Sequence, residues 1–68
     1  MTGVVSTFDD EAGLGTITAD DGTTFAFHCT AIADGSRTIS VNTPVDFEPR
    51  PGRHGTYEAG AITPAAPR

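Results

Sequence analysis

The side chains best suited to chemistry in this sequence are two histidines, His28 and His54, and one cysteine, Cys29. A metal site in a protein takes about three or four such ligands, and no further histidine or cysteine is present. Paired carboxylates, a Ser–His–Asp group and a glycine-rich phosphate-binding loop are also missing in any usable context. We therefore expect a protein that is not an enzyme and that holds no metal or cofactor.

The charged residues are distributed unevenly along the chain. The net charge is −5, there is no lysine, and the arginines are Arg37, Arg50, Arg53 and Arg68. Residues 1–36 therefore contain no lysine or arginine, although they contain Asp9, Asp10, Glu11, Asp20, Asp21 and Asp34. Proteins that bind nucleic acid usually carry a basic footprint. Here the basic residues concentrate in the loop 50–54, with Arg37 as a possible neighbour.

Length and composition indicate one small domain with a thin core. A chain of 68 residues leaves no room for a second domain. A single cysteine excludes an internal disulfide framework. The N-terminus lacks the pattern of a signal peptide, and no apolar run approaches the roughly 20 residues that span a bilayer. We expect a cytoplasmic protein without a membrane or small-molecule partner.

The pattern along the chain predicts short strands separated by turns. Strands are expected at 3–8, 14–19, 23–29, 45–48 and 56–63, the fourth beginning after Pro44. Asp20-Asp21-Gly22 is a hairpin signal, and residues 30–33 fit one helical turn capped by Thr30. The loop 49–55 is rich in proline and glycine. Five such strands with a long connection before the fourth suit a small barrel, and an SH3-like barrel is the alternative arrangement.

Two segments of the sequence resemble the cold-shock protein family. Gly13-Leu14-Gly15-Thr16-Ile17 is similar to the family's first RNA-binding motif, which is usually Gly-aromatic-Gly-aromatic-Ile. The run from Phe25 to Ile32, FAFHCTAI, is similar to the second motif, usually VFVHFSAI. The resemblance covers residues 1 to about 63 and implies an all-β, five-stranded antiparallel barrel of the OB-fold type. We assign this barrel to residues 1–64 and a short flexible tail to residues 65–68.

The resemblance also implies a binding face. Family members stack single-stranded RNA or DNA on aromatic side chains of the first three strands. In this chain Leu14, Thr16 and Ala26 occupy usual aromatic positions, Cys29 and Thr7 occupy two more, and His28 is retained. Strand alternation places Val4, Ser6 and Phe8 on that face, and Phe25 and Phe27 in the core. The implied nucleic-acid-binding residues are Phe8, Leu14, Thr16, Ala26, His28, Arg37, Arg50 and Arg53.

Two functions are compatible with these residues. The first is a single-stranded nucleic-acid-binding protein with weakened affinity, acting as an RNA chaperone or as a regulator of transcription or translation. The second is a protein-interaction module that kept the barrel and lost nucleic-acid binding. The acid-rich first half favours a basic protein partner in that second case.

Overall fold

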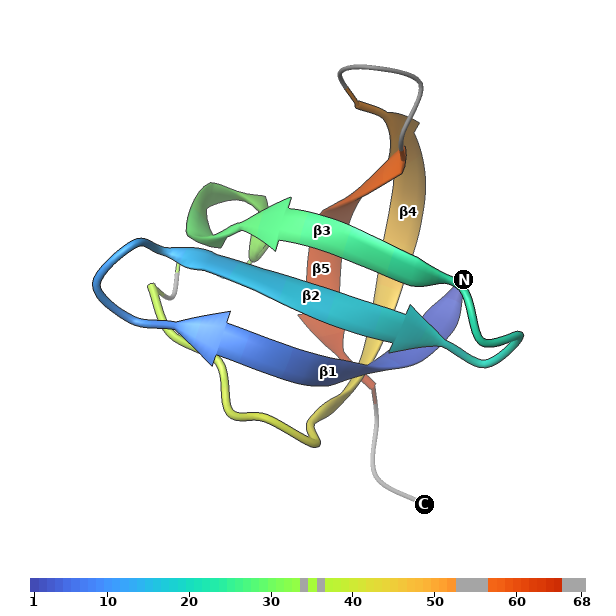
Figure 1. Cartoon of the computed structure of the whole chain (residues 1–68), viewed down its shortest axis with the longest axis horizontal. Helices are drawn as coiled ribbons and strands as arrows, with labels where there is room; N and C mark the ends of the chain where they lie inside the picture. Colours follow the sequence, from blue (N-terminus) through green and yellow to red (C-terminus); the bar gives the residue numbers. More distant parts are fainter. Residues whose placement is uncertain (34, 36, 53–56, 66–68) are drawn as a thin grey trace.

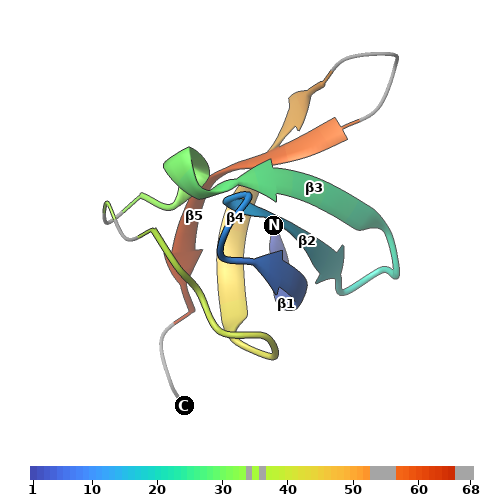
Figure 2. The same ribbon diagram turned by 60° about the vertical axis from the view of Figure 1, so that its left-hand side comes forward.

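The computed structural model describes residues 1–33, 35, 37–52 and 57–65. Within them, strands β1 to β5 form a closed barrel in the order β1-β2-β3-β5-β4 (Figures 1 and 2). The elements are β1 (Thr2–Asp9), β2 (Leu14–Ala19), β3 (Thr24–His28), the 3-10 turn η1 (Cys29–Ala31), β4 (Pro44–Pro51) and β5 (Tyr57–Pro64). This confirms the predicted all-β OB-type barrel. No helix in the described ranges has the length and apolar character needed to cross a membrane.

Strands β1, β2 and β3 form an antiparallel meander held by two tight turns. Gly13 closes the first turn with a φ of 68°, and Gly22 closes the second with a φ of 91°, a region that favours glycine. In the second turn the Thr23 N–H donates to Asp21 Oδ1 at 2.9 Å. This hydrogen bond favours the ionised carboxylate and lowers the pKa of Asp21.

A β-bulge interrupts the pairing of β1 with β2. Val5 lies opposite Ile17, but the next partners are Thr7 and Thr16, so Ser6 is the extra residue. Beyond the bulge, the side chain at each β1 position points to the opposite side from that expected for an unbroken strand. The prediction that Val4, Ser6 and Phe8 share one face is therefore wrong for Phe8.

Among the described residues the core contains ten buried apolar side chains, of which Val5, Ile17, Val45 and Ile62 are fully buried. Phe25 and Phe27 are buried there, as predicted. Phe25 packs edge-on against Phe47, with ring centroids 5.0 Å apart. Each of these residues alternates with exposed neighbours along its strand, which is the pattern of a sheet with one buried face.

Strand β4 is longer than predicted. Residues 49–51 were expected to form a loop, but Pro49, Arg50 and Pro51 pair with β5 opposite Ala59, Glu58 and Tyr57. The Phe47 N–H donates to the Met1 carbonyl on the β1 side of the strand. Backbone N–H groups two residues apart on a strand point to the same side, so the nitrogens of Pro49 and Pro51 face the same side of β4 as the Phe47 N–H. Strand β1 does not extend along β4 that far, so no hydrogen bond is lost there. Proline is tolerated at such an open edge.

The helical turn begins earlier than predicted, with His28 and not Thr30 as its N-cap. The His28 ring nitrogen Nδ1 accepts a hydrogen bond from the Thr30 N–H at 3.2 Å. The turn ends at Ala31, and the Ala33 N–H donates to the Ile62 carbonyl at 2.8 Å.

The barrel closes through a narrow contact between β3 and β5. Ala26 pairs with Glu58 in parallel, and Ile32 forms an isolated parallel bridge with Ile62. The sheet is therefore mixed at this junction and not wholly antiparallel. At the other end of β5, the Ala65 N–H donates to the Pro44 carbonyl at 2.9 Å. The remaining predicted tail residues, 66–68, lie outside the described residues.

Candidate nucleic-acid interface

The exposed side of the β1–β2–β3 meander presents three rows of side chains that run across the strands. We call this surface the outer face. Its rows are Val4–Thr18–Thr24, Thr7–Thr16–Ala26 and Asp9–Leu14–His28, with Ser6 beside Thr7 at the bulge. The face is small and polar, and Leu14 at 52% exposure is its largest open apolar side chain.

The bulge gathers three hydroxyl groups at the centre of the outer face. Thr16 Oγ1 lies 2.8 Å from Ser6 Oγ and 2.7 Å from Thr7 Oγ1. Ser6 Oγ also donates to the Thr16 carbonyl at 3.2 Å. Thr7 was not among the predicted site residues, although the family resemblance placed it at a usual aromatic position. These hydroxyls can donate to phosphate or base edges but provide no stacking surface.

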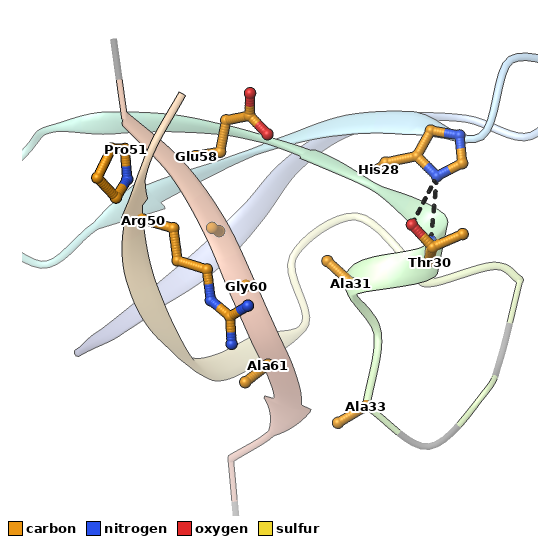
Figure 3. Close-up of a pocket in the computed structure, with 10 residues that line it drawn as sticks. His28, Thr30, Ala31, Ala33, Arg50, Pro51, Glu58, Gly60 and Ala61 are labelled. Atoms are coloured by element: carbon orange, nitrogen blue, oxygen red, sulfur yellow. Dashed lines mark hydrogen bonds between the residues drawn. The ribbon is translucent and has the colours of Figure 1, made fainter. Parts of the chain in front are cut away.

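His28 ends β3 at the edge of the outer face, next to Leu14. Because Nδ1 accepts from the Thr30 N–H, the neutral imidazole carries its proton on Nε2. Thr30 Oγ1 also lies 3.0 Å from Nδ1. Figure 3 shows the second ring nitrogen turned away from Thr30. The turn η1 therefore holds the ring in one orientation and leaves one donor and the ring face available to a ligand.

Phe8 is placed differently from the prediction. It is half-buried, packs against the core, and stacks on the buried Phe27 ring with centroids 5.9 Å apart and an interplanar angle of 13°. Its pairing partner is Gly15, whose buried position lies opposite Phe27. One side of Phe8 lines a hollow with Asp10 and residues 38–41. A role for Phe8 in binding remains a prediction, but it is not part of the outer face.

Two of the predicted arginines lie in hollows that His28 also lines. Arg37 shares one hollow with His28, Cys29 and Ile32. Arg50 shares another with His28, Thr30 and Glu58 (Figure 3). Each of these two arginines therefore shares a hollow with His28, although they come from different parts of the chain. Arg53 and His54 lie outside the described residues.

The sequence comparisons agree with this architecture. Residues 1–64 match the family described as the 'Cold-shock' DNA-binding domain. The chain belongs to this cold-shock family. It is 40% identical over 65 residues to the cold shock-like protein CspG of Escherichia coli K12, covering 93% of both chains. The CspG protein of Shigella flexneri matches to the same extent.

Cold-shock membership fits the two sequence motifs on β2 and β3, and the structure brings both onto one sheet. Of the predicted residues in these motifs, Leu14, Thr16, Ala26 and His28 all belong to the outer face. His28 carries the only aromatic ring of that face, as far as the described residues extend.

Proposed function

We propose that this chain binds single-stranded RNA or DNA on the outer face, with His28 as the main contact. The proposal rests above all on the position of His28. The Nδ1 atom of the imidazole is held by Thr30 at the edge of the face, and Nε2–H does not contact Thr30. The ring also lines two hollows, one shared with Arg37 and the other with Arg50. Family membership supports single-stranded nucleic acid as the ligand over the protein-interaction alternative. Within the cell, the protein would act as an RNA chaperone or as a regulator of transcription or translation.

We propose that the affinity is weaker than that of a face with aromatic side chains. Stacking on an aromatic side chain contributes about 1–3 kcal/mol per base. If Leu14, Thr16 and Ala26 each forgo about 1 kcal/mol, the affinity falls by about a hundredfold. The hydroxyl groups at the bulge replace part of this loss by hydrogen bonding. Arg37, Arg50 and Arg53 would supply phosphate contacts.

A cytoplasmic location is part of the same proposal, because single-stranded nucleic acid is present there. The single cysteine is free, which suits a reducing compartment.

The test is a titration of a labelled pyrimidine-rich single strand, followed by fluorescence anisotropy at low and moderate salt. We expect His28→Ala to weaken binding by about tenfold and His28→Phe to weaken it less, because a ring remains for stacking. Thr63→Ala, at an exposed position of β5, is the control and should bind as the parent does. Failure of the parent to bind at high micromolar protein in low salt would exclude the proposed function.

A map of amide chemical shifts with the same strand locates the interface independently of the variants. Shifts should concentrate on β1 to β3 and η1. Shifts confined to β4 and the early part of β5 would contradict the assignment of the outer face.

A further inference from the structure

The side chain of Arg50 on β4 lies over Gly60 of the neighbouring strand β5. In the β4–β5 ladder Arg50 is opposite Glu58, and Glu48 is opposite Gly60. A Cβ atom on Gly60 would lie only 2.7 Å from Arg50 Cδ and 2.9 Å from its Cζ. The guanidinium group therefore occupies the space that any other residue at position 60 would fill. Gly60 does not have a positive φ, so its backbone would accept an alanine.

The two acids near Arg50 differ in how they relate to it. Glu58 is its direct partner in the ladder, but its side chain turns over Gly52, where a Cβ atom would lie 2.8 Å from Glu58 Oε2. Figure 3 shows Arg50 directed toward Gly60 and Glu58 directed the opposite way. Arg50 instead forms an ion pair with Glu48, with 3.1 Å between Nη2 and Oε2. Both side chains of this pair are more than half exposed.

The hollow beside Arg50 connects this ion pair with the outer face. Its walls are β5 with the end of β4 on one side, and His28 with η1 on the other (Figure 3). Its volume is about 480 Å³. A single-stranded nucleic acid whose base contacts the imidazole of His28 would place the adjacent phosphate group in this hollow. A guanidinium group binds a phosphate with two parallel hydrogen bonds, so phosphate and Glu48 compete for Arg50.

We propose that Gly60 and Glu48 together set how available Arg50 is to the phosphate of a bound strand. Gly60 is a positioning residue, because its bare Cα lets the guanidinium lie toward the hollow. Glu48 is a competing counter-ion that the phosphate displaces. An exposed ion pair contributes little to stability, so its exchange for a phosphate is not opposed by the fold. This inference rests on the proposed function.

The test compares two substitutions that change the net charge equally, Glu48→Gln and Glu58→Gln. The probe is a labelled oligothymidylate of about eight nucleotides. We expect Glu48→Gln to tighten binding by about two- to fivefold, the effect of removing one exposed ion pair. Glu58→Gln should have a smaller effect. Glu58 itself lines the hollow, so if only the repulsion between a carboxylate and the phosphate matters, Glu58→Gln should tighten binding more than Glu48→Gln. That result would overturn the role of Glu48.

Gly60→Ala tests the positioning role. We expect it to weaken binding as much as Arg50→Ala and to lower the slope of log affinity against log salt by about 0.7, the loss of one phosphate contact. In the Arg50→Ala background the Gly60→Ala change should have no further effect, because the crowding side chain is gone. Additive losses would instead indicate damage to the barrel and would overturn the positioning role.

The outcomes also separate this inference from the proposed function. If the parent does not bind the probe, both are wrong. If the parent binds and His28→Ala weakens binding, but the Arg50, Glu48 and Gly60 variants behave as the parent does, only the present inference is wrong.

Discussion

Gly15 illustrates how one missing side chain shapes the barrel. A Cβ atom at this position would lie 2.6 Å from both the Thr7 carbonyl oxygen and Cζ of Phe27. Because Gly15 leaves this space free, the bulged strand β1 approaches β2 and Phe8 stacks on Phe27. Gly15 therefore has a structural role, and the crowding around it gives the reason. A nucleic-acid contact is not required to explain it.

We predict that Gly15→Ala destabilises the protein by about 1–3 kcal/mol, the usual cost of overpacking. The obstacles are a backbone carbonyl and a buried ring, and neither can move without disturbing the core. Gly60→Ala is the matched comparison, since the three atoms nearest to its Cβ all belong to the flexible and exposed Arg50 side chain, and it should cost less. Urea unfolding of both variants measures the difference. Equal destabilisation by the two variants would mean that the atoms around Gly15 move aside as easily as the Arg50 side chain does at Gly60.

At the scale of elements, most strands follow from the sequence. Strand β2 has the predicted ends, and β1 and β3 differ from the predictions by one residue at each end. These segments are bounded by turns with clear signals, such as Asp20-Asp21-Gly22. The end of β4 was missed because proline normally argues against a strand. Only the pairing with β5 on one side and the open edge on the other makes Pro49 and Pro51 acceptable.

The candidate site was less predictable, for a physical reason located at Ser6. A bulge inserts one extra residue into a strand. The sequence gives no sign of it here, because serine and threonine are compatible with either face of a strand. The alternation therefore gave Phe8 to the outer face, whereas the structure turns Phe8 toward the core and places Thr7 on the outer face. The residues on β2 and β3, where pairing is continuous, were assigned correctly to one face. The positions of Gly60 and Glu48 around Arg50 carried no signal that sequence reasoning could use.

The middle row of the outer face allows a direct test of the missing stacking surface. Ala26 is exposed on β3 between Thr16 and Glu58, so a larger side chain there would extend over the face without entering the core. We predict that Ala26→Phe tightens binding to a pyrimidine-rich strand by about tenfold or more, because one added stack contributes about 1–3 kcal/mol. Fluorescence anisotropy measures the change.

Ala26→Leu is the control for this prediction, since it adds apolar bulk at the same position without an aromatic ring. It should tighten binding much less than Ala26→Phe. Equal effects of the two variants would show that apolar contact and not stacking limits affinity at this row.

At the scale of the whole molecule, the barrel separates packing from recognition. All four phenylalanines of the chain lie in the core or against it. A chain of 68 residues buries only about 60% of the surface that its unfolded form exposes. Phe25, Phe27 and Phe47 are buried in this small core and are not available to a ligand, whereas Phe8 is half-buried and lines a hollow. The outer face carries hydroxyl groups, the His28 imidazole, Asp9 and the small set of apolar side chains Val4, Leu14 and Ala26. The hollows beside it contain Arg37 and Arg50.

This distribution of charge has a consequence for binding in salt. Each phosphate contact with a single strand contributes about 0.7 to the slope of log affinity against log salt. The net charge is −5 and the chain has four arginines, of which Arg37 and Arg50 lie in the hollows beside His28. We predict a slope no steeper than about −2, equivalent to roughly three contacts.

Adding one positive charge to the outer face should change that slope by a known amount. We predict that Ser6→Lys steepens it by about 0.7 and tightens binding at low salt, because a lysine at the bulge would reach a phosphate of the bound strand. Thr63→Lys raises the net charge equally at an exposed position of β5, outside the outer face, and should leave the slope unchanged. If both lysines steepen the slope equally, the phosphates respond to the overall charge of the barrel. If only Ser6→Lys does so, the strand lies over the bulge, where the hydroxyl groups of Ser6, Thr7 and Thr16 meet.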